Sequence, residues 1–216
     1  MVRSRSLCID HSDEFDKWWN EDLFDWEYSS NYLAQYCSRY FKTWWNSYLF
    51  EWERASGSLA QYCSEYFTEW WDAYLFSWEY SSDYLAKYCS DHFKDWWDPS
   101  NFNWLHSPAL AKYCAEHFKT WWSPKKYNWV HGSKVLAQYC SDQYDIWWDP
   151  IRFEIRAAYK ELFKYCTKVF PQWWELDAML MKQFALRRDS EEYGDCGMFC
   201  NWVEAMKYLS LECNYD

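Results

Sequence analysis

The sequence has few of the residues that make tight turns, with only 4 glycines and 5 prolines among 216 residues. Sandwiches and barrels of short strands need many such turns, so this scarcity disfavours an all-β fold. No run of 18 apolar residues occurs, and we therefore expect no transmembrane helix and no membrane partner. The first residues are basic but reach Asp10 before any apolar stretch, which argues against a secretory signal. These absences predict a cytoplasmic protein.

The motifs that carry common catalytic chemistry are also missing. The sequence contains no phosphate-binding glycine-rich loop, no Gly-x-Ser-x-Gly, no His-Glu-x-x-His and no dinucleotide-binding fingerprint. Cys196 and Cys200 would face one side of a helix, and Cys213 follows them, but no fourth ligand or Cys-x-x-Cys spacing accompanies these residues. We therefore predict a protein that is not an enzyme and that uses neither a cofactor nor a metal.

Basic residues are scarce in the first half of the chain. Residues 1–100 hold 18 acidic and 8 basic side chains, whereas residues 101–216 hold 15 and 14, and the whole chain has a net charge of −11. An acidic surface repels phosphates, so direct binding to nucleic acid or to anionic lipid is not expected. An alternative interpretation is that the acidic residues keep an aromatic-rich protein soluble.

Aromatic residues, in contrast, make up 25% of the chain, and they recur at a nearly constant interval of 26 residues. Trp-Trp pairs begin at Trp18, Trp44, Trp70, Trp96, Trp121, Trp147 and Trp173. Tyr-Cys pairs recur with the same period, their cysteines being Cys37, Cys63, Cys89, Cys114, Cys140 and Cys166. In the first five units a third tryptophan follows the first of the pair by eight residues, at Trp26, Trp52, Trp78, Trp104 and Trp129, and the last two units have Ile155 and Met181 there. This periodicity is the signature of a tandem-repeat fold.

Within one unit, residues 56–71 predict a single amphipathic helix of about 15 residues, because the apolar side chains share one face at about 100° per residue. The pattern lacks the period of two that a strand requires. A serine stands at the predicted start of this helix in five units, where it is typical of an N-cap: Ser30, Ser56, Ser82, Ser107 and Ser133. Pro108 follows one of these serines and fits the first helical position.

A second set of capping residues follows the tryptophan pairs directly: Asn20, Asn46, Asp72, Asp98, Ser123 and Asp149. About eight residues separate each from the next serine, enough for a short α or 3₁₀ helix. The sequence therefore predicts an all-α fold, an α-solenoid of about seven units that each pair a long helix with a short one. We expect one repeat domain over 1–216, with an irregular first unit (1–28), regular repeats (29–185) and a C-terminal cap (186–216) that contains a capping helix.

The helical pattern also predicts which side chains are buried. The six repeat cysteines lie on the apolar face, on helices expected about 8–10 Å apart, whereas a disulfide needs a Cα separation of about 4.4–6.8 Å. We therefore expect reduced, buried thiols. Trp70 lies near the centre of the apolar arc and Trp71 at its edge, so the second tryptophan of a pair is the one expected to reach the surface. His92 and His117 occupy an edge position of the core.

The leading functional hypothesis is a protein-interaction module that presents an acidic, aromatic-rich surface to a protein partner with a basic surface. The tentative partner-binding residues are exposed positions that vary between units: Arg39, Glu65, Asp91, Glu116 and Asp142, each two residues after a repeat cysteine, with Glu69 and Asp95. Two alternatives remain open. One is an acidic inhibitor of viral or phage type that occupies a nucleic-acid-binding groove. The other is a small-ligand binder that uses grooves lined by tryptophan.

Overall fold

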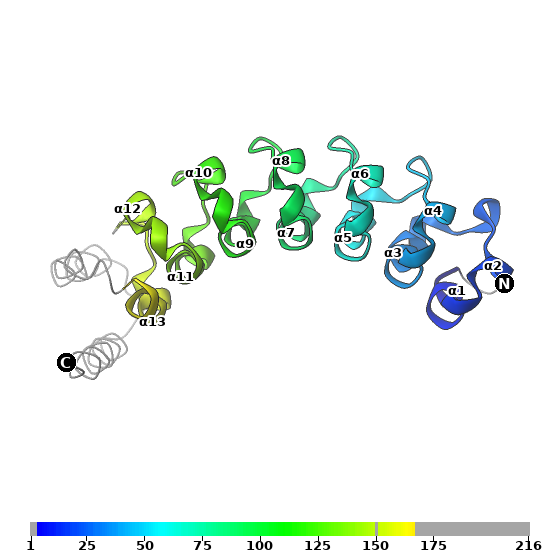
Figure 1. The fold of residues 1–216 in the computed structure, drawn as a ribbon, viewed down its shortest axis with the longest axis horizontal. Helices are drawn as coiled ribbons and strands as arrows, with labels where there is room; N and C mark the ends of the chain where they lie inside the picture. Colours follow the sequence, from blue (N-terminus) through cyan, green and yellow to red (C-terminus); the bar gives the residue numbers. More distant parts are fainter. Residues whose placement is uncertain (1–3, 150, 167–216) are drawn as a thin grey trace, which may run out of the picture. The chain divides into compact units, whose positions relative to one another are not determined.

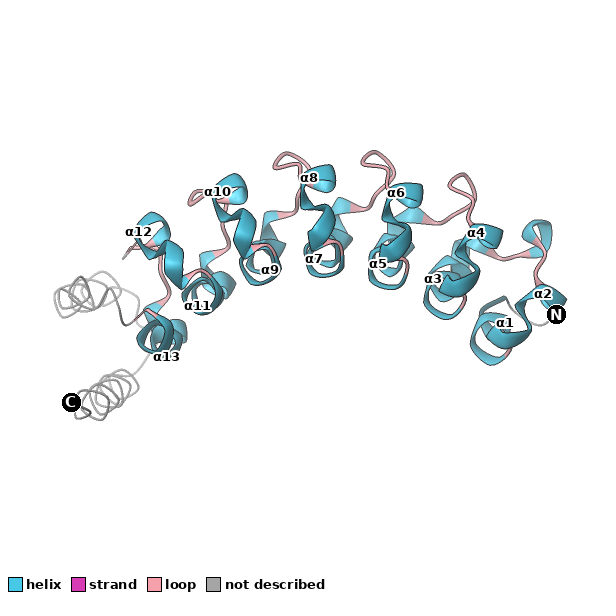
Figure 2. Cartoon of the chain, viewed as in Figure 1, coloured by secondary structure: helices cyan, strands magenta, loops and turns pink. Residues whose placement is uncertain are grey.

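The computed structural model describes residues 4–149 and 151–166, and every regular element in these ranges is a helix (Figures 1 and 2). The longer helices are α1 (Ser4–Asp10), α3 (Trp26–Tyr36), α5 (Trp52–Tyr62), α7 (Trp78–Tyr88), α9 (Ser107–Tyr113), α11 (Trp129–Tyr139) and α13 (Ile155–Tyr165). The four-residue helices are α2 (Phe15–Trp18), α4 (Phe41–Trp44), α6 (Phe67–Trp70), α8 (Phe93–Trp96), α10 (Phe118–Trp121) and α12 (Tyr144–Trp147).

A 3₁₀ turn precedes each short helix, and two further 3₁₀ turns follow the tryptophan pairs of two repeats. The first group is η1 (Ser12–Glu14), η3 (Ser38–Tyr40), η4 (Ser64–Tyr66), η5 (Ser90–His92), η7 (Ala115–His117) and η8 (Ser141–Gln143). The second is η2 (Glu21–Leu23) and η6 (Trp104–His106). One repeat is therefore a long helix, a 3₁₀ turn, a short helix and a loop.

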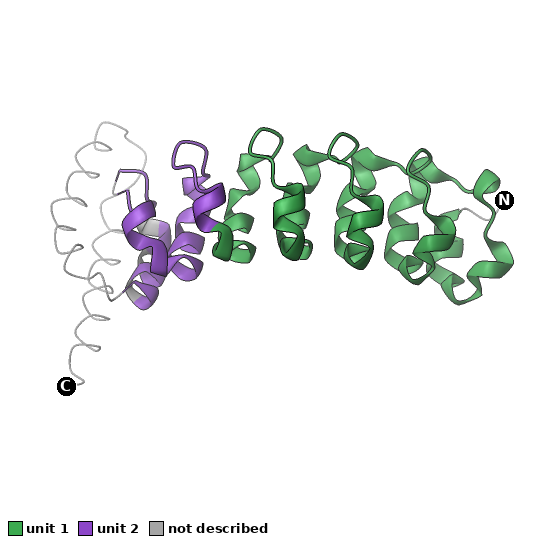
Figure 3. Cartoon of the chain, turned by 45° about the horizontal axis from the view of Figure 1, so that its top comes forward, with its two compact units in different colours: residues 1–117 green, residues 118–216 purple. Residues whose placement is uncertain are grey.

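Repeats stack in the order of the sequence. The chain divides into two compact units, 1–117 (unit 1) and 118–216 (unit 2) (Figure 3). In unit 1, α1, α3, α5, α7 and α9 pack one against the next and form a layer, with α4, α6 and α8 in a second layer (Figure 1). In unit 2, α11 packs against α13. This sequential packing of helix pairs confirms the predicted α-solenoid. The seventh tryptophan pair and the expected capping helix lie outside the described residues.

Helices α3, α5, α7 and α11 begin at the third tryptophan, four residues before the serine predicted as the N-cap, and α9 begins at Ser107 itself, with His106 as its N-cap. In α5 the carboxylate of Glu51 accepts a hydrogen bond from the backbone N–H of Arg54 at 2.9 Å, and the residue lies outside the helix at φ −83° and ψ 95°. Asp25 and Asn128 cap α3 and α11 in the same way. The prediction that Ser30, Ser56, Ser82, Ser107 and Ser133 are N-caps is therefore wrong.

The repeat serines instead join neighbouring long helices. Ser56 is fully buried within α5, where its hydroxyl donates to the carbonyl of Trp52. The same oxygen accepts the backbone N–H of Ser77, the residue before α7, at 3.1 Å. Ser30 accepts equivalently from Glu51 at 3.2 Å, and Ser133 in unit 2 from Glu154 at 3.0 Å. A serine fits because it is small enough for the helix interface and can donate and accept at once.

The predicted 15-residue helix is interrupted at the repeat cysteine. In the α5 repeat, Cys63 ends the long helix at φ −124° and ψ 25°, and the chain turns through η4 into α6. The indole N–H of Trp70 donates to the carbonyl of Cys63 at 2.8 Å inside the core. The same bond joins Trp44 to Cys37 at 2.8 Å. The Cys63 carbonyl also accepts the backbone N–H of Tyr66 at 3.0 Å, so the first tryptophan of the pair is the second donor to a carbonyl at the helix end.

The loop after each tryptophan pair is closed by the residues that the sequence analysis identifies as a second set of caps. The carboxylate of Asp72 accepts the backbone N–H of Tyr74 at 2.8 Å and of Leu75 at 3.2 Å. Asn20 and Asp149 each accept two backbone N–H groups in the same way. The capping role of Asn20, Asn46, Asp72, Asp98 and Asp149 is confirmed, whereas Ser123 accepts the backbone N–H groups of Lys126 and Tyr127 with its backbone carbonyl. The segment that follows is a 3₁₀ helix after Asn20, and a turn without helix after Asn46, Asp72, Asp98 and Ser123.

The first repeat keeps this geometry although its sequence is irregular. Ser4 takes the place of the repeat serine and accepts the backbone N–H of Asp25 at 2.9 Å. The carbonyl of His11 takes the place of the cysteine carbonyl and accepts the indole N–H of Trp18 at 2.8 Å. Residue 11 contributes only its backbone carbonyl to the second contact, so a change of side chain there leaves that contact in place.

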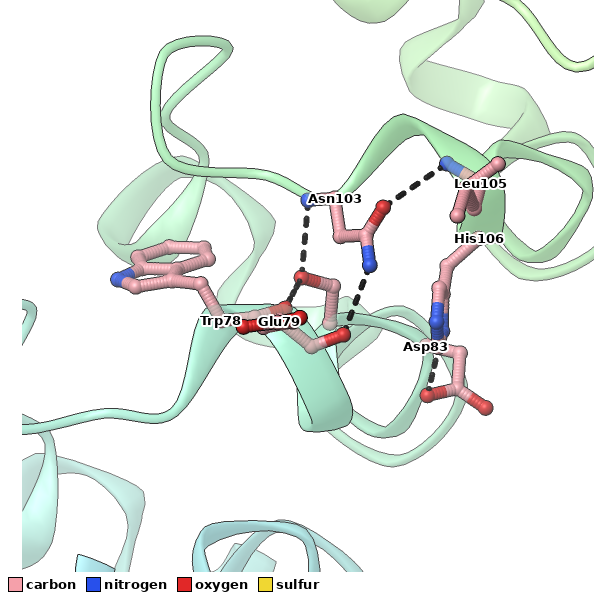
Figure 4. A network of polar contacts seen from close by, with 7 residues as sticks. Trp78, Glu79, Asp83, Asn103, Leu105 and His106 are labelled. Carbon is pink, nitrogen blue, oxygen red and sulfur yellow. Dashed lines mark hydrogen bonds and ion pairs between the residues drawn. The ribbon is translucent and has the colours of Figure 1, made fainter. Parts of the chain in front are cut away.

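The junction between α7 and α9 is one residue shorter than the others and has its own polar network (Figure 4). The serine contact persists, since Ser82 accepts the backbone N–H of Asn103 at 3.1 Å. The amide of Asn103 also accepts from Leu105 N–H at 3.1 Å and donates to the carbonyl of Glu79 at 2.7 Å. His106 Nδ1 lies 2.9 Å from a carboxylate oxygen of Asp83. The deletion converts the first turn of the helix into η6 and leaves the stacking contacts intact.

Candidate functional site

The predicted partner-binding residues all lie on the outside of the repeats. Those two residues after a cysteine lie on the 3₁₀ turns and are exposed: Arg39, Glu65, Asp91, Glu116 and Asp142. Glu69 and Asp95 are exposed on α6 and α8. Their exposure agrees with the sequence analysis, and in unit 1 the stacking of equivalent turns puts successive members in rows.

Several members of these rows already have a partner of opposite charge or a neighbouring histidine. Arg39 lies 2.7 Å from Asp13 of the preceding repeat, and Glu69 lies 3.5 Å from Lys42 of the preceding repeat. Asp95 lies 3.4 Å from His92 on its own repeat. Exposed pairs of this kind contribute about 0–1 kcal/mol. The rows are therefore mixed in charge at these positions, and Arg39 is a cation within an otherwise acidic series.

In the five pairs that begin at Trp44, Trp70, Trp96, Trp121 and Trp147, the two tryptophans have different environments, as the sequence predicts. Trp70 is 1% exposed, whereas Trp71 is half-buried. The physical reason differs from the predicted one, because Trp71 lies beyond the end of α6 with an extended backbone at φ −63° and ψ 122°. Its ring stacks on Phe67 at 5.3 Å and meets Trp78 edge-on at 5.6 Å.

A stack of three rings connects each repeat of unit 1 to the next. Phe67 is parallel to Trp71 on its own repeat and to His92 of the following repeat, with the His92 centroid 4.4 Å away. Tyr66 takes the place of His92 at the preceding junction, 4.5 Å from Phe41. The edge position that the sequence analysis assigns to His92 and His117 is thus a stacking position, which any flat aromatic ring can fill.

The tryptophans also differ in what their indole N–H groups contact. The third tryptophan of the repeat donates to a loop carbonyl, as Trp78 does to Ala73 at 2.8 Å. Within the described residues of unit 1, the indole N–H of the second tryptophan of each pair has no hydrogen-bond partner; these residues are Trp19, Trp45, Trp71 and Trp97. These indole nitrogens are not fully buried, so their N–H groups reach solvent. We call these four residues the tryptophan row.

A groove lies on the layer of long helices, at a place that the sequence analysis missed. It has a volume of about 630 Å³ and runs over α3, α5 and α7. Its lining, which we call the tyrosine groove, is Gln35, Glu53, Arg54, Gly57, Ser58, Gln61, Tyr62, Tyr80, Ser81 and Tyr84. Gly57 shapes it, because a Cβ atom there would lie 3.2 Å from the ring of Tyr84 and 3.3 Å from the hydroxyl of Ser81. The absence of a side chain at residue 57 lets the tyrosine ring lie close to α5.

Several positions that line the groove vary from repeat to repeat, while others, such as Glu53 and Tyr62, are the same in the repeats of α3, α5 and α7. Equivalent residues are Tyr28, Arg54 and Tyr80 at one position, and Tyr32, Ser58 and Tyr84 at another. In contrast, the buried leucine is constant: Leu33, Leu59 and Leu85. This signal is present in the sequence, but placing the helix start at Ser56 puts residues 52–55 outside the long helix and hides the pattern.

The thiols of the described cysteines are free and buried. Burial raises the pKa of Cys63 and of Cys89 to about 12, with smaller contributions from Glu65 and Asp91. The Cys63 thiol points to the carbonyl of Ala34 on the preceding long helix, at 3.8 Å. These cysteines therefore pack the interface between repeats, as predicted. Cys196, Cys200 and Cys213 lie outside the described residues.

Within residues 4–149 and 151–166, no group of three or more His, Cys, Asp or Glu side chains could hold a metal ion. No helix in that part of the chain is both long and apolar enough to cross a membrane. Comparison with protein-family models, with curated proteins and with solved structures finds no match to this chain. Functional inference therefore depends on the surfaces described above.

Proposed function

We propose that the chain is a non-catalytic protein-interaction module, and that unit 1 binds a basic segment of a partner protein in the tyrosine groove. The observation that carries the proposal is the coincidence of the groove with the positions that vary between repeats. Solenoids bind through extended surfaces whose residues differ from repeat to repeat on a constant scaffold. Arg54, Tyr80 and Tyr84 vary on such a scaffold, and they line the groove.

The chemistry of the lining suits a peptide. Tyrosine and arginine are the residue types that dominate binding energy at protein interfaces, because they bury a large area with a polar tip. The amides of Gln35 and Gln61 can both donate and accept, as a peptide backbone requires. Tyr80 is 60% exposed, so its ring is available for contact. The groove is polar and aromatic rather than purely apolar, which favours a reversible partner over a permanent subunit.

The charge of this half of the chain supports a basic partner. Residues 1–100, which contain the whole groove, carry 18 acidic and 8 basic side chains. A field of this sign raises the rate of association with a basic segment and weakens as salt is added. Basic peptides should therefore bind faster at low ionic strength, whereas their dissociation should depend mainly on the tyrosines.

A screen of random peptides against the full chain tests the proposal. Recovered peptides should be rich in Lys and Arg, and their affinity should fall as salt increases. The double variant Tyr80→Ala, Tyr84→Ala should weaken binding by about tenfold or more, which corresponds to the loss of one interface hot spot.

Tyr74→Ala provides the matched control, because Tyr74 is 98% exposed on a loop outside the groove. Its affinity for the recovered peptides should equal that of the wild type. Recovery of peptides without basic enrichment, or binding that survives the double variant, would contradict the proposal.

A further inference from the structure

We propose that the tryptophan row is a second binding site, which takes a proline-rich, basic polypeptide segment in the polyproline II conformation. The row is formed by Trp19, Trp45, Trp71 and Trp97, one from each of four successive repeats. It involves none of the residues that line the tyrosine groove. The proposal therefore goes beyond the function above and stands or fails separately from it.

The three indoles of one repeat differ in their hydrogen bonding. In the α5 repeat, Trp70 donates to Cys63 and Trp52 to Ser47, so these two N–H groups are used within the fold. Trp71 uses its ring for packing but leaves its N–H to solvent, and Trp45 and Trp97 do the same in the adjacent repeats. The row thus offers one fixed, free donor per repeat. A ligand that fits it should supply acceptors at the same interval.

Ring packing holds the indole donors of the row rigidly. The ring of Trp71 is parallel to Phe67 within 16° and meets Phe76 at 5.3 Å. The corresponding pairs have nearly the same geometry in the other repeats, with Trp45 parallel to Phe41 within 18° and Trp97 parallel to Phe93 within 15°. Packing on several rings holds each indole in one orientation, so little side-chain entropy is lost when a ligand binds.

The spacing between successive repeats favours one backbone conformation for the ligand. The row has one member per repeat, and the long helices α3, α5 and α7 of these repeats pack directly, about 8–10 Å apart. A polyproline II helix rises about 3.1 Å per residue with three residues per turn, so equivalent carbonyls recur about every 9.3 Å on one side. A β-strand returns to the same side about every 6.6–6.8 Å, and an α-helix about every 5.4 Å. Among regular backbones, polyproline II matches the interval of the repeats best.

A ligand in the polyproline II conformation also supplies the hydrogen-bond acceptors that the row requires. Polyproline II has no internal hydrogen bonds, so all of its carbonyl groups remain free for the indole donors. Aromatic surfaces with a polar tip are the usual recognition surface for this conformation, because proline rings pack on the rings while carbonyls accept from the tip. About nine residues of such a peptide would reach from Trp19 to Trp97.

Carboxylates next to the row favour a basic ligand. Asp72 and Asp98 directly follow Trp71 and Trp97. One oxygen of Asp72 accepts two backbone N–H groups of its loop, whereas Asp98 accepts the backbone N–H of Ser100 on one oxygen and the side-chain amide of Asn101 on the other. The row therefore carries negative charge at its α6 and α8 repeats. A ligand with Lys or Arg at every third position would set these cations beside the carboxylates, with the intervening prolines on the indoles.

The experiment uses the full chain, ¹⁵N-labelled at tryptophan, and the synthetic peptide (Pro-Pro-Lys)₄. In the free protein, the indole N–H groups of the row should exchange with deuterated water faster than those of the buried tryptophans. Adding the peptide should shift and protect these signals. The flexible peptide (Gly-Ser-Lys)₄, of equal length and charge, should bind at least about tenfold more weakly because it is not preorganised.

Two variants then separate the indole donors from the ring packing. The variant Trp71→Phe, Trp97→Phe keeps an aromatic ring but removes two free donors, and should lower the affinity for (Pro-Pro-Lys)₄ by about two- to tenfold per donor. Trp78→Phe makes the same chemical change at a donor that the fold already uses, and should bind as the wild type does. Circular dichroism checks that both variants fold.

Equal binding of the two peptides would overturn the proposal. Unchanged affinity in the double variant, or an equal loss in Trp78→Phe, would also overturn it. The two double variants also distinguish the two sites. If (Pro-Pro-Lys)₄ no longer binds the Tyr80→Ala, Tyr84→Ala variant but binds the Trp71→Phe, Trp97→Phe variant fully, the peptide occupies the tyrosine groove. That result would refute a site at the row. If (Pro-Pro-Lys)₄ binds at the row and no peptide binds in the tyrosine groove, the result supports this inference and contradicts the proposed function.

Discussion

The junction from α5 to α7 and the junction from α7 to α9 differ by one residue, yet they keep the same buried contacts. The serine hydroxyl accepts a backbone N–H at 3.1 Å in both, from Ser77 at the first junction and from Asn103 at the second. The cysteine thiol reaches an alanine carbonyl of the preceding helix at 3.7 Å for Cys89 and at 3.6 Å for Cys114. The start of the helix changes instead, from α-helix to 3₁₀.

This comparison shows which contacts set the stacking of the repeats. Helix length can vary by one residue at the solvent end, where water satisfies a displaced N–H group. The serine, cysteine and tryptophan contacts lie in the core, where a lost hydrogen bond would leave a buried polar group unpaired. Variants at equivalent positions of the two junctions should therefore behave alike inside the core and differently at the helix start.

The largest effect is expected for the buried tryptophans. Trp70→Ala and Trp96→Ala should each lower the free energy of unfolding by about 3–5 kcal/mol, because each opens a cavity. Each also removes one of the two donors to a cysteine carbonyl, which keeps the backbone N–H of Tyr66 or His92. Urea denaturation of the two variants gives the values, and Trp71→Ala, at a half-buried position, should cost clearly less. A Trp71→Ala variant less stable than Trp70→Ala would contradict the burial that separates the two residues.

The repeat serines should have the next largest effect, and it should be the same at both junctions. Ser56→Ala and Ser82→Ala each leave a backbone N–H of the next repeat unpaired, which should cost about 1–3 kcal/mol. Ser56→Asp separates this role from an N-cap, since aspartate is a good N-cap but would bury a charge here. Thermal melts should therefore show Ser56→Asp as the less stable of the two Ser56 variants. Stability equal to the wild type would restore the N-cap interpretation.

A smaller effect, and the clearest difference between the junctions, is expected at the residue before each helix. Asn103→Ala removes a cap and a bond to the Glu79 carbonyl, and should cost about 0.5–2 kcal/mol. Ser77→Ala removes a side chain that makes no capping bond, and should change stability by less than about 0.5 kcal/mol. Hydrogen exchange at the Leu105 amide should rise only in the first variant. Similar costs for the two variants would mean that the network in Figure 4 does not compensate for the deletion.

The smallest difference between junctions is expected for the thiols. Burial raises the pKa of Cys89 and of Cys114 to about 12 from an ordinary value of 9.0, so both stay protonated at neutral pH and should react slowly with iodoacetamide. The stabilising contribution of a raised thiol pKa is complete below about pH 9 and is lost as the pH rises toward 12. Labelling followed by mass spectrometry checks the first point, and urea denaturation at increasing pH checks the second. Rapid labelling of either cysteine in the native protein would place its thiol at the surface.

Much of the candidate surface was visible in the sequence, but not its extent. The exposed position of Glu65 and the half-buried position of Trp71 follow from periodicity, because both lie near the edge of the apolar pattern. The tyrosine groove does not, since it depends on the register of α3, α5 and α7 and on the close approach of Tyr84 to Gly57. The free indole donors are likewise invisible in the sequence, because three tryptophans per repeat have the same chemistry and only their contacts differ.

The sequence by itself determined the repeat, the helical class, the buried cysteines and the polar residues that close the loops, because each depends on local spacing or on the side chain's own chemistry. Only the tertiary structure decided where the long helix begins and ends. A serine hydroxyl can cap a helix, or bond back to a carbonyl four residues earlier, with similar ease. The choice at Ser56 is made by the backbone N–H of Ser77, which lies 21 residues away and comes into reach only when the next repeat is stacked.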